Sequence, residues 1–292
     1  MIDPRITRRT PVVMQGITGR AGRSHLGLMR GCGTNIVAGV SLRTAGSEID
    51  GVPLFGSCVE AVARTGATAS ILFVGADQLL GAIEDAVGAG IKLLVTPTEG
   101  MPIHDALKAK RLTLQHGVTW IGPSTPGMAV PGEAKLGFLP DTCLLPGPLG
   151  IMSKSGTLSY ESGYRLVQHN VGQSVWVGVG GDPVKGVRFA DLVPFYAADA
   201  QTEAVLIIGE IGGAEEEQFA AALAAACFAK PVFALIAGRS APEGVSMGHA
   251  GALVHGAHGT YAAKKAALEA AGARVFGSLD EMCREVVRVL RR

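Results

Sequence analysis

Short apolar runs rich in β-branched residues alternate along the chain with longer Ala-rich segments whose apolar positions recur with helical spacing. The first half contains strand candidates at residues 12–15, 36–40, 70–74, 93–96 and 118–121. The second half contains them at residues 149–152, 174–179, 204–208, 231–236 and 273–276. Strands that alternate with helices usually pair in parallel beneath those helices, so the pattern predicts a doubly wound α/β fold.

The alternation is interrupted between Gly122 and Gly150, where six prolines leave little periodicity. Proline restricts the chain to extended and turn conformations, which is typical of a connection along a surface. We therefore expect a first domain at residues 1–122, a Pro- and Gly-rich linker at residues 123–149 and a second domain at residues 150–292.

Composition narrows the class of protein. Of the 292 residues 48% are hydrophobic, and 26 basic against 25 acidic residues give a net charge of +1, so nucleic acid is not an expected partner. No apolar run reaches the roughly 18 residues that span a membrane, and the N-terminus lacks the apolar core of a signal peptide, so we expect a cytoplasmic protein with no membrane association. The five cysteines show no CxxC spacing, which predicts reduced, mostly buried thiols and no metal site.

A Gly-rich turn follows the first predicted strand and reads Gly16-Ile17-Thr18-Gly19-Arg20-Ala21-Gly22. Such glycines let backbone N–H groups approach a phosphate at a helix N-terminus, and Thr18 and Arg20 add a hydroxyl and a cation. The spacing is GxxGxxG, and Arg43 lies where NAD-binding proteins place an acidic residue. These features favour a ligand with an additional phosphate, CoA or NADP; the alternative is a turn that only packs helix against sheet.

A second strand-to-helix turn contains Ser155, Gly156 and Thr157. These residue types are typical of an N-cap and first helical turn, where backbone N–H groups and the helix dipole favour an anion. The pattern is equally that of an ordinary helix cap, so on its own it leaves a phosphate site as one of two interpretations.

His249 is the candidate reactive group because its neighbours Gly248, Ala250 and Gly251 are too small to crowd an imidazole. The space beside the ring would accommodate a phosphate-sized group, whereas the simpler alternative is a structural histidine. Glu210 ends a predicted strand, at the edge where open α/β sheets bind their ligands. A carboxylate there would accept one imidazole N–H and raise the basicity of the other nitrogen.

The acidic run Glu215-Glu216-Glu217 follows Glu210 closely. Acidic residues are favoured in the first turn of a helix by the dipole. We expect these three side chains to be solvated there, and not to form a metal cluster.

These segments, with Thr98-Glu99-Gly100, Gly180-Gly181-Asp182-Pro183 and Ala237-Gly238, occur in one order between about residues 10 and 290. In this the chain resembles the α subunits of succinyl-CoA synthetases (succinate–CoA ligases) and the related NDP-forming acyl-CoA ligases. The resemblance implies an N-terminal CoA-binding, Rossmann-like domain followed by a flavodoxin-like ligase domain that carries a phosphohistidine.

The resemblance also implies roles for individual residues. The phosphorylated histidine corresponds to His249 and the glutamate that positions it to Glu210, while Tyr160 matches a tyrosine assigned to the carboxylate substrate. The helix opening at Ser155, Gly156 and Thr157 matches one that faces the phosphohistidine. The CoA-binding positions are Thr18, Gly19, Arg20, Ala21, Pro97, Thr98 and Glu99.

The implied reaction joins a carboxylic acid to CoA and converts ATP or GTP to the diphosphate and phosphate. In the related ligases a β subunit supplies an ATP-grasp nucleotide site with Mg²⁺, so we expect a β partner in an αβ or α2β2 assembly. No metal site is expected on this chain itself.

Departures from the related ligases fall near the expected ligands. Thr44 replaces the lysine that contacts CoA, and the neighbouring Arg43 is a candidate substitute. Ser124 and Thr125 replace an Asn-Cys pair near the substrate, and Val245-Ser246 replaces a basic pair before Met247. Succinate therefore competes with malate, citrate and a sulfonated acid as the expected substrate.

Two other functional classes remain open from the sequence. One is a non-catalytic CoA-binding module, which would have no physical need for both the segment around His249 and the segment around Glu210. The other is an NADP-dependent oxidoreductase, although the second half offers no arrangement of residues suited to hydride transfer.

Overall fold

The structure is a computed structural model that describes residues 2–242, 244, 248–249, 251–254 and 259–291. The chain divides into two compact units. The first unit comprises residues 4–139 and 184–186, and the second comprises residues 1–3, 140–183 and 187–292. Each unit contains a largely parallel sheet with helices, so the predicted α/β fold is confirmed.

The sheet of the first unit has the strand order β3-β4-β2-β1-β5-β6-β7, in which only the β3–β4 pair is antiparallel. Its strands are β1 (Pro11–Gln15), β2 (Asn35–Val40), β3 (Glu48–Ile49), β4 (Val52–Phe55), β5 (Ala69–Leu72), β6 (Leu93–Val95) and β7 (Thr119–Ile121). Parallel strands covered on both faces are continuously apolar, as in β5 and β6, whose residues are all buried.

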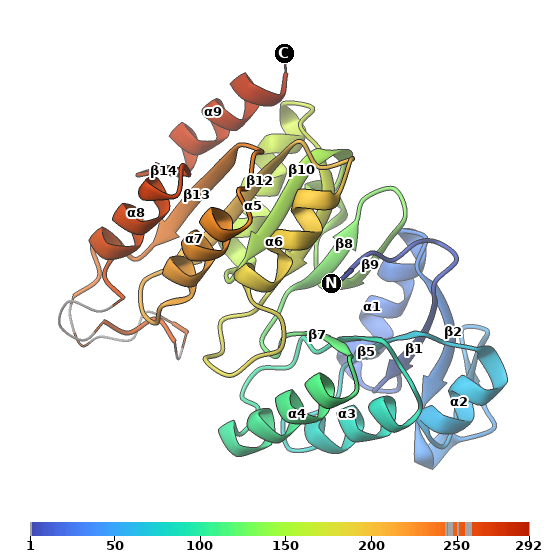
Figure 1. Ribbon diagram of the computed structural model, residues 1–292. Helices are drawn as coiled ribbons and strands as arrows, with labels where there is room; N and C mark the ends of the chain where they lie inside the picture. The colour runs from blue at the N-terminus through green and yellow to red at the C-terminus, as the bar shows by residue number, and fades with distance from the viewer. Residues whose placement is uncertain (1, 243, 245–247, 250, 255–258, 292) are drawn as a thin grey trace. The chain divides into compact units, whose positions relative to one another are not determined.

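Helices cover both faces of this sheet. They are α1 (Arg20–Gly31), α2 (Cys58–Thr65), α3 (Leu79–Gly88) and α4 (Ile103–Gln115), with a short 3-10 helix η1 (Leu42–Thr44). Figure 1 shows α2, α3 and α4 side by side on one face and α1 on the other. The Trp120 indole is buried among them and donates a 2.9 Å hydrogen bond to Thr96 Oγ1, so its polar N–H is satisfied inside the core.

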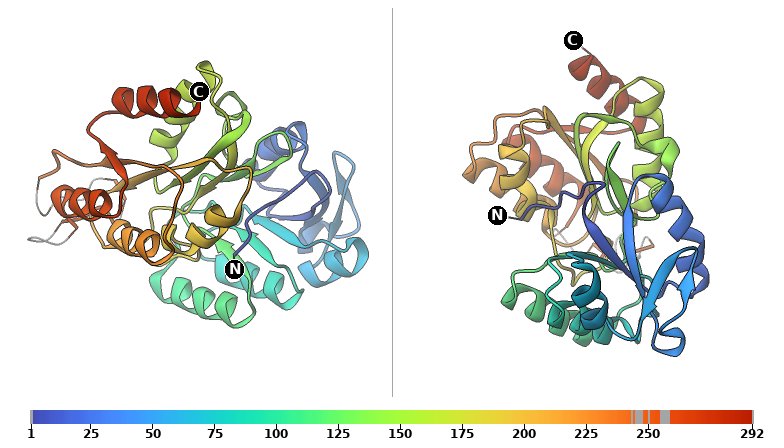
Figure 2. Two further views of the ribbon diagram at one scale, coloured as in Figure 1. Left: turned by 45° about the horizontal axis from the view of Figure 1, so that its top comes forward. Right: turned by 90° about the vertical axis from the view of Figure 1, so that its right-hand side faces the viewer.

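The second unit has five parallel strands in the order β14-β13-β12-β10-β11. They are β10 (Pro146–Ser153), β11 (Gln173–Gly178), β12 (Ala204–Glu210), β13 (Val232–Ala237) and β14 (Arg274–Phe276). Helices α6 (Phe189–Ala198), α7 (Glu215–Ala225) and α8 (Tyr261–Ala270) pack in a row on one face, and α5 (Gly156–Gln168) packs with α9 (Leu279–Leu290) on the other (Figures 1 and 2). The predicted strands of both halves are therefore present.

The segment expected as a linker, residues 123–149, is not irregular throughout. It contains an antiparallel hairpin of β8 (Gly127–Val130) and β9 (Ala134–Gly137), followed by the 3-10 helix η2 (Asp141–Cys143). None of the prolines lies within these two strands, so the hairpin ladder loses no N–H donor to them, whereas Pro146 and Pro148 lie at the start of β10. Among the described residues, no helix has the length and apolar character needed to cross a membrane.

The cysteines are free thiols, of which Cys58, Cys143 and Cys283 are buried, Cys32 is half-buried and Cys227 is exposed. Burial, with a smaller contribution from Asp85, raises the pKa of Cys58 to about 12. Since the thiolate is the reactive form, Cys58 is protected both by position and by protonation.

We expect iodoacetamide to label the native chain first at Cys227 and last at Cys58 at about pH 8, because Cys227 is exposed, whereas Cys58 is buried and its pKa is raised to about 12. Timed labelling followed by peptide mass spectrometry measures the order. Replacing Cys227 by Ser should remove the fast phase and leave the slow phase unchanged. Rapid labelling of Cys58 in the native chain would show that the packing around α2 is wrong.

Candidate active site

The Gly-rich turn of the first unit is held tightly between strand and helix. It begins after β1 at Gly16, which has φ 75° and where a Cβ would lie 2.4 Å from the carbonyl oxygen of Phe73. A Cβ on Gly22 would lie 2.3 Å from the carbonyl oxygen of Gly16. Because neither position has room for a side chain, the close approach of α1 to the turn depends on both glycines.

This turn presents the residues expected to bind CoA. Helix α1 starts at Arg20 with Gly19 as its N-cap, and no side chain forms a capping hydrogen bond. Thr18, Gly19, Arg20 and Ala21 are all exposed. The first-turn N–H groups, which lack partners within the helix, and the cation of Arg20 therefore provide the elements of an anion-binding site.

The other predicted residues of the first unit follow parallel strands and so lie at the same edge of the sheet. Arg43 and Thr44 are in η1 after β2, residues 97–99 follow β6, and Ser124 and Thr125 follow β7. The Ser124 N–H donates to the Thr98 carbonyl oxygen over 2.9 Å, which joins two of these loops. Thr125 is 3% exposed and its Oγ1 accepts the Gly127 N–H at 2.9 Å, so its hydroxyl stabilises the turn beside Ser124.

In the second unit, the carboxyl ends of β12 and its neighbours bring the predicted residues of that unit together. Glu210 is the last residue of β12 and pairs with Ala237, after which the chain continues to His249. Ser153 at the end of β10 pairs with Ile208, two residues before Glu210. The segment that starts α5 and the segment that carries His249 therefore leave the same sheet edge, where this class of fold places its ligands.

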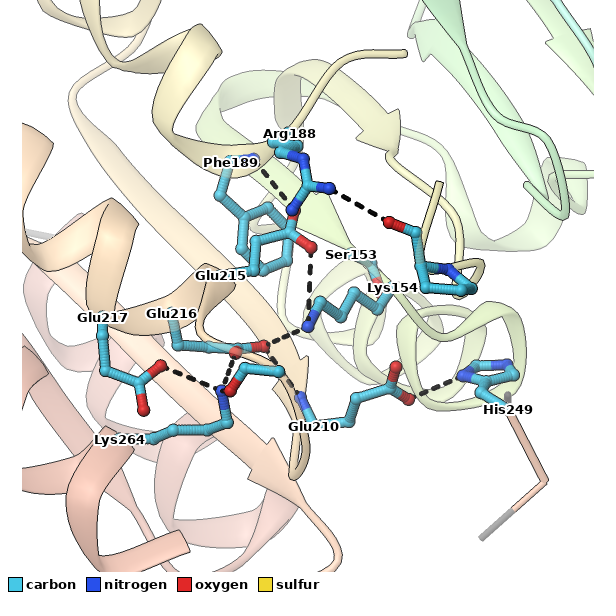
Figure 3. Close-up of polar contacts among 12 residues, drawn as sticks. Ser153, Lys154, Arg188, Phe189, Glu210, Glu215, Glu216, Glu217, His249 and Lys264 are labelled. Carbon is cyan, nitrogen blue, oxygen red and sulfur yellow. Dashed lines mark hydrogen bonds and ion pairs between the residues drawn. The ribbon is translucent and has the colours of Figure 1, made fainter. Parts of the chain in front are cut away.

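The imidazole of His249 contacts the predicted glutamate. Nδ1 of His249 lies 2.6 Å from Oε2 of Glu210, whose side chain is 8% exposed against 30% for the histidine (Figure 3). A carboxylate oxygen accepts hydrogen bonds, so Nδ1 is the donor in this contact, and in the neutral ring Nε2 then carries the lone pair. A Cβ on Gly181 would lie 2.6 Å from His249 Cγ, so the ring packs directly over this glycine.

Helix α5 begins as its sequence predicts. Ser155 is the N-cap, and its hydroxyl accepts the Leu158 N–H at 3.2 Å. Gly156 and Thr157 occupy the first turn, where N–H groups have no partner within the helix. Tyr160, one turn further on, is half-buried, and burial, together with the nearby Cys143, raises its pKa to about 12. Its hydroxyl is thus protonated near neutral pH and available as a donor.

Glu215 and Glu216 of the acidic run after Glu210 are buried and Glu217 is half-buried, which corrects the expectation that all three are solvated. Glu215 is 4% exposed and Glu216 is fully buried. Lys154 Nζ lies 2.9 Å from Glu216 Oε1 and 3.5 Å from Glu215 Oε2. Lys264, also fully buried, pairs with Glu216 and, over 3.0 Å, with Glu217 (Figure 3). The first turn of α7 is therefore the acidic half of an internal ionic cluster.

The charges of this cluster stabilise one another. Burial by itself would raise the pKa of Glu216, but the ammonium groups of Lys154 and Lys264 outweigh it and hold that pKa below the usual carboxyl value. Burial by itself would lower the pKa of Lys154, but the carboxylates of Glu216 and Glu215 outweigh burial and raise that pKa above the usual lysine value. We conclude that Glu216 is ionised near neutral pH. The sequence contains one sign of this cluster, which is the cation of Lys154 directly before the N-cap of α5.

Some predicted features fall outside the described residues. Ala250, Met247 and the substituted pair Val245-Ser246 are among them. Within the part of the chain that is described, no group of three or more His, Cys, Asp or Glu side chains is arranged to hold a metal ion.

Comparison with known proteins defines the class. Residues 7–100 match the family described as CoA binding domain, and residues 152–274 match the family described as CoA-ligase. The first unit is thus a CoA-binding domain and the second a ligase domain. The α subunit of the ADP-forming succinate–CoA ligase of Aquifex aeolicus is 44% identical over 288 residues, which cover 98% of this chain and 94% of that protein. The chain belongs to the family of CoA-ligase α subunits.

Two further relatives extend the comparison. The ADP-forming sulfoacetate–CoA ligase subunit SauD of Bilophila wadsworthia is 41% identical over 92% of this chain and 93% of its own length. The fold matches that of the ATP citrate lyase from Methanothrix soehngenii, solved in complex with citrate and coenzyme A, with a TM-score of 0.88 at 23% identity. That match covers 98% of this chain, which spans half the length of the lyase chain.

We expect Gly181→Ala to separate His249 from Glu210, because the added methyl would occupy the position of the imidazole. In an NMR spectrum of isotope-labelled histidine, the variant should lose the single Nδ1–H tautomer that the parent shows. Gly81→Ala is the matched control, since a Cβ there meets nothing within 4 Å. An unchanged histidine spectrum in Gly181→Ala would contradict the placement of the ring.

Proposed function

We propose that this chain is the α subunit of an NDP-forming acyl-CoA ligase that transfers a phosphoryl group through His249. The observation that supports it most is the 2.6 Å contact between His249 Nδ1 and Glu210 Oε2. An imidazole whose Nδ1 donates to a carboxylate has its lone pair on Nε2, which makes it a strong neutral nucleophile near physiological pH. The 44% identity to a succinate–CoA ligase α subunit supports the same chemistry.

The proposed reaction has three transfers. His249 Nε2 attacks the γ-phosphorus of ATP or GTP and releases the nucleoside diphosphate. An oxygen of the carboxylate then attacks the phosphohistidine, which restores the imidazole and forms an acyl phosphate. The CoA thiolate finally attacks the acyl carbon and expels phosphate, a far better leaving group than the oxide that a free carboxylate would have to lose.

The first turn of α5 is the proposed binding site for the phosphoryl group. Ser155 uses its hydroxyl to cap the helix, and Gly156 and Thr157 supply backbone N–H donors at the positive end of the helix dipole. Preorganised donors of this kind stabilise charge that develops during transfer without reorganising. Glu210 would position His249 and stabilise its protonated form.

CoA is proposed to bind to the first unit. Thr18, Gly19, Arg20 and Ala21 would bind its diphosphate, with Pro97, Thr98 and Glu99 in the neighbouring loop. Arg43 and Thr44 follow β2, where a cation favours a phosphate on the ribose. The family match over residues 7–100 supports this assignment.

A short dicarboxylic acid such as succinate is the proposed substrate, bound in part by the protonated hydroxyl of Tyr160. Ser124 and Thr125 are also proposed to contact the acid, because they replace the Asn-Cys pair of related ligases. Malate, citrate and a sulfonated acid are the alternatives, and the identity to a sulfoacetate–CoA ligase subunit supports the last of them. An ATP-grasp β subunit is the proposed partner and would bind the nucleotide with Mg²⁺.

In the chain assembled with its partner subunit, His249→Ala should abolish the acid-labile label that γ-labelled ATP or GTP leaves on the parent. Autoradiography after short incubation measures the label, and CoA-dependent release of the diphosphate should fall by at least about 1000-fold. Replacing His116, which caps the C-terminus of α4, by Ala is the control and should label like the parent. Full labelling of His249→Ala would exclude the relay, and CoA binding without any label in the parent would favour a non-catalytic module.

Arg43→Ala should weaken the binding of CoA by about 10-fold, the loss of one charge-assisted hydrogen bond, and leave dephospho-CoA unaffected, since that analogue lacks the ribose phosphate. Isothermal titration calorimetry measures both affinities. Arg64→Ala, at an exposed position in the last turn of α2, should leave both unchanged. Equal loss for the two ligands would show that Arg43 does not bind this phosphate, and tight NADP binding would favour an oxidoreductase.

A further inference from the structure

Glu216 links the internal ionic cluster to the histidine site. Its Oε1 accepts the backbone N–H of Glu210 over 3.1 Å. The side chain of that same Glu210 reaches His249 Nδ1, so the contacts run from Glu216 through Glu210 to His249 (Figure 3). The fully buried carboxylate of Glu216 is therefore hydrogen-bonded to Glu210, the residue that contacts the imidazole.

The chain leaves a space shaped for this carboxylate. A Cβ on Gly209 would lie 2.5 Å from Glu216 Oε1 and 2.9 Å from Glu216 Cγ. The carboxylate is thus pressed against the backbone of the last two residues of β12, where any other residue than glycine would displace it.

Two lysines from different elements clamp the Glu216 carboxylate. The Lys154 ammonium approaches Oε1 from the residue after β10, and the backbone N–H of Lys154 donates to the Ile208 carbonyl oxygen at 2.9 Å. Lys264 approaches Oε2 from α8 and also donates to the Gly213 carbonyl oxygen at 3.0 Å. The Lys264 ammonium is thus anchored a second time, and the Lys154 ammonium also lies 3.5 Å from Glu215 Oε2, so Glu216 has little freedom to rotate.

Stability alone does not account for such a cluster. Replacing buried ion pairs by apolar residues of similar volume is often neutral or stabilising, because desolvation offsets the attraction between the charges. Buried charges can instead fix the geometry of the groups that they contact, and here the cluster contacts the backbone of Glu210.

We propose that Glu216, held between Lys154 and Lys264, is the positioning residue of the histidine site: it fixes the backbone of Glu210 and thereby directs the Glu210 carboxylate at His249 Nδ1. The catalytic consequence rests on the proposed function, whereas the positioning itself does not. Glu217 provides the matched comparison, since it also pairs with Lys264 but lies 28% exposed and does not hydrogen-bond to the Glu210 N–H.

The test compares Glu216→Gln with Glu217→Gln in the full chain assembled with its partner subunit. A glutamine cannot accept from both lysines and the Glu210 N–H, because one of its terminal atoms is a donor. In Glu216→Gln we expect a mixed tautomer of His249 by NMR of labelled histidine, and a rate of His249 phosphorylation lowered by about 10- to 100-fold at unchanged KM for the nucleotide. Glu217→Gln should resemble the parent in both measurements.

Gly209→Ala serves as the second variant, because it displaces the Glu216 carboxylate while keeping every charge. It should reproduce both effects if Glu216→Gln fails to fold. If either variant folds and keeps the parent's tautomer and rate, the proposal is wrong. It is also wrong if neither variant folds, because Glu216 would then serve stability alone. If the parent takes no label on His249, the proposed function fails, while the NMR comparison still decides the positioning.

Discussion

The contact between Glu210 and His249 is the interaction on which the proposed site of the second unit depends. It places a carboxyl group at the end of a buried strand, and a carboxylate is expensive to desolvate unless its surroundings supply donors and charge. Glu216 holds the backbone of Glu210, and Lys154 and Lys264 hold Glu216. Lys154 directly follows β10 and Lys264 lies in α8, so segments distant in the sequence together support the one hydrogen bond to the imidazole.

Both proposed sites also depend on close approach to the backbone. Gly16 and Gly22 allow α1 to meet its turn in the first unit, while Gly181 and Gly209 leave the space taken by the His249 ring and the Glu216 carboxylate in the second. In each unit the residues proposed for its site follow parallel strands and gather at one sheet edge. A strand–helix fold thus provides N–H donors and room for an anion, and the particular side chains decide which chemistry follows.

The sequence predicts the main strands from local signals, which are apolar runs and turn residues. It suggests the contact of Glu210 with His249 from the position of Glu210 at a strand end and from the resemblance to the CoA ligases. It does not reveal the two-residue strand β3, its antiparallel partner β4, or the hairpin of β8 and β9 within a Pro-rich segment. The burial of Glu215 and Glu216 is missed for a different reason. An acidic first turn is favourable in water, and only tertiary structure places Lys264, 48 residues further on, against it.

The regiochemistry of the phosphohistidine tests the central claim most directly. With the assembled protein labelled in its histidine nitrogens and incubated with ATP, phosphorus NMR distinguishes a phosphoryl group on Nε2 from one on Nδ1. Because Glu210 occupies Nδ1, the account predicts phosphorylation of His249 on Nε2 alone. A phosphoryl group on Nδ1, or on another residue while His249 remains unmodified, would contradict it.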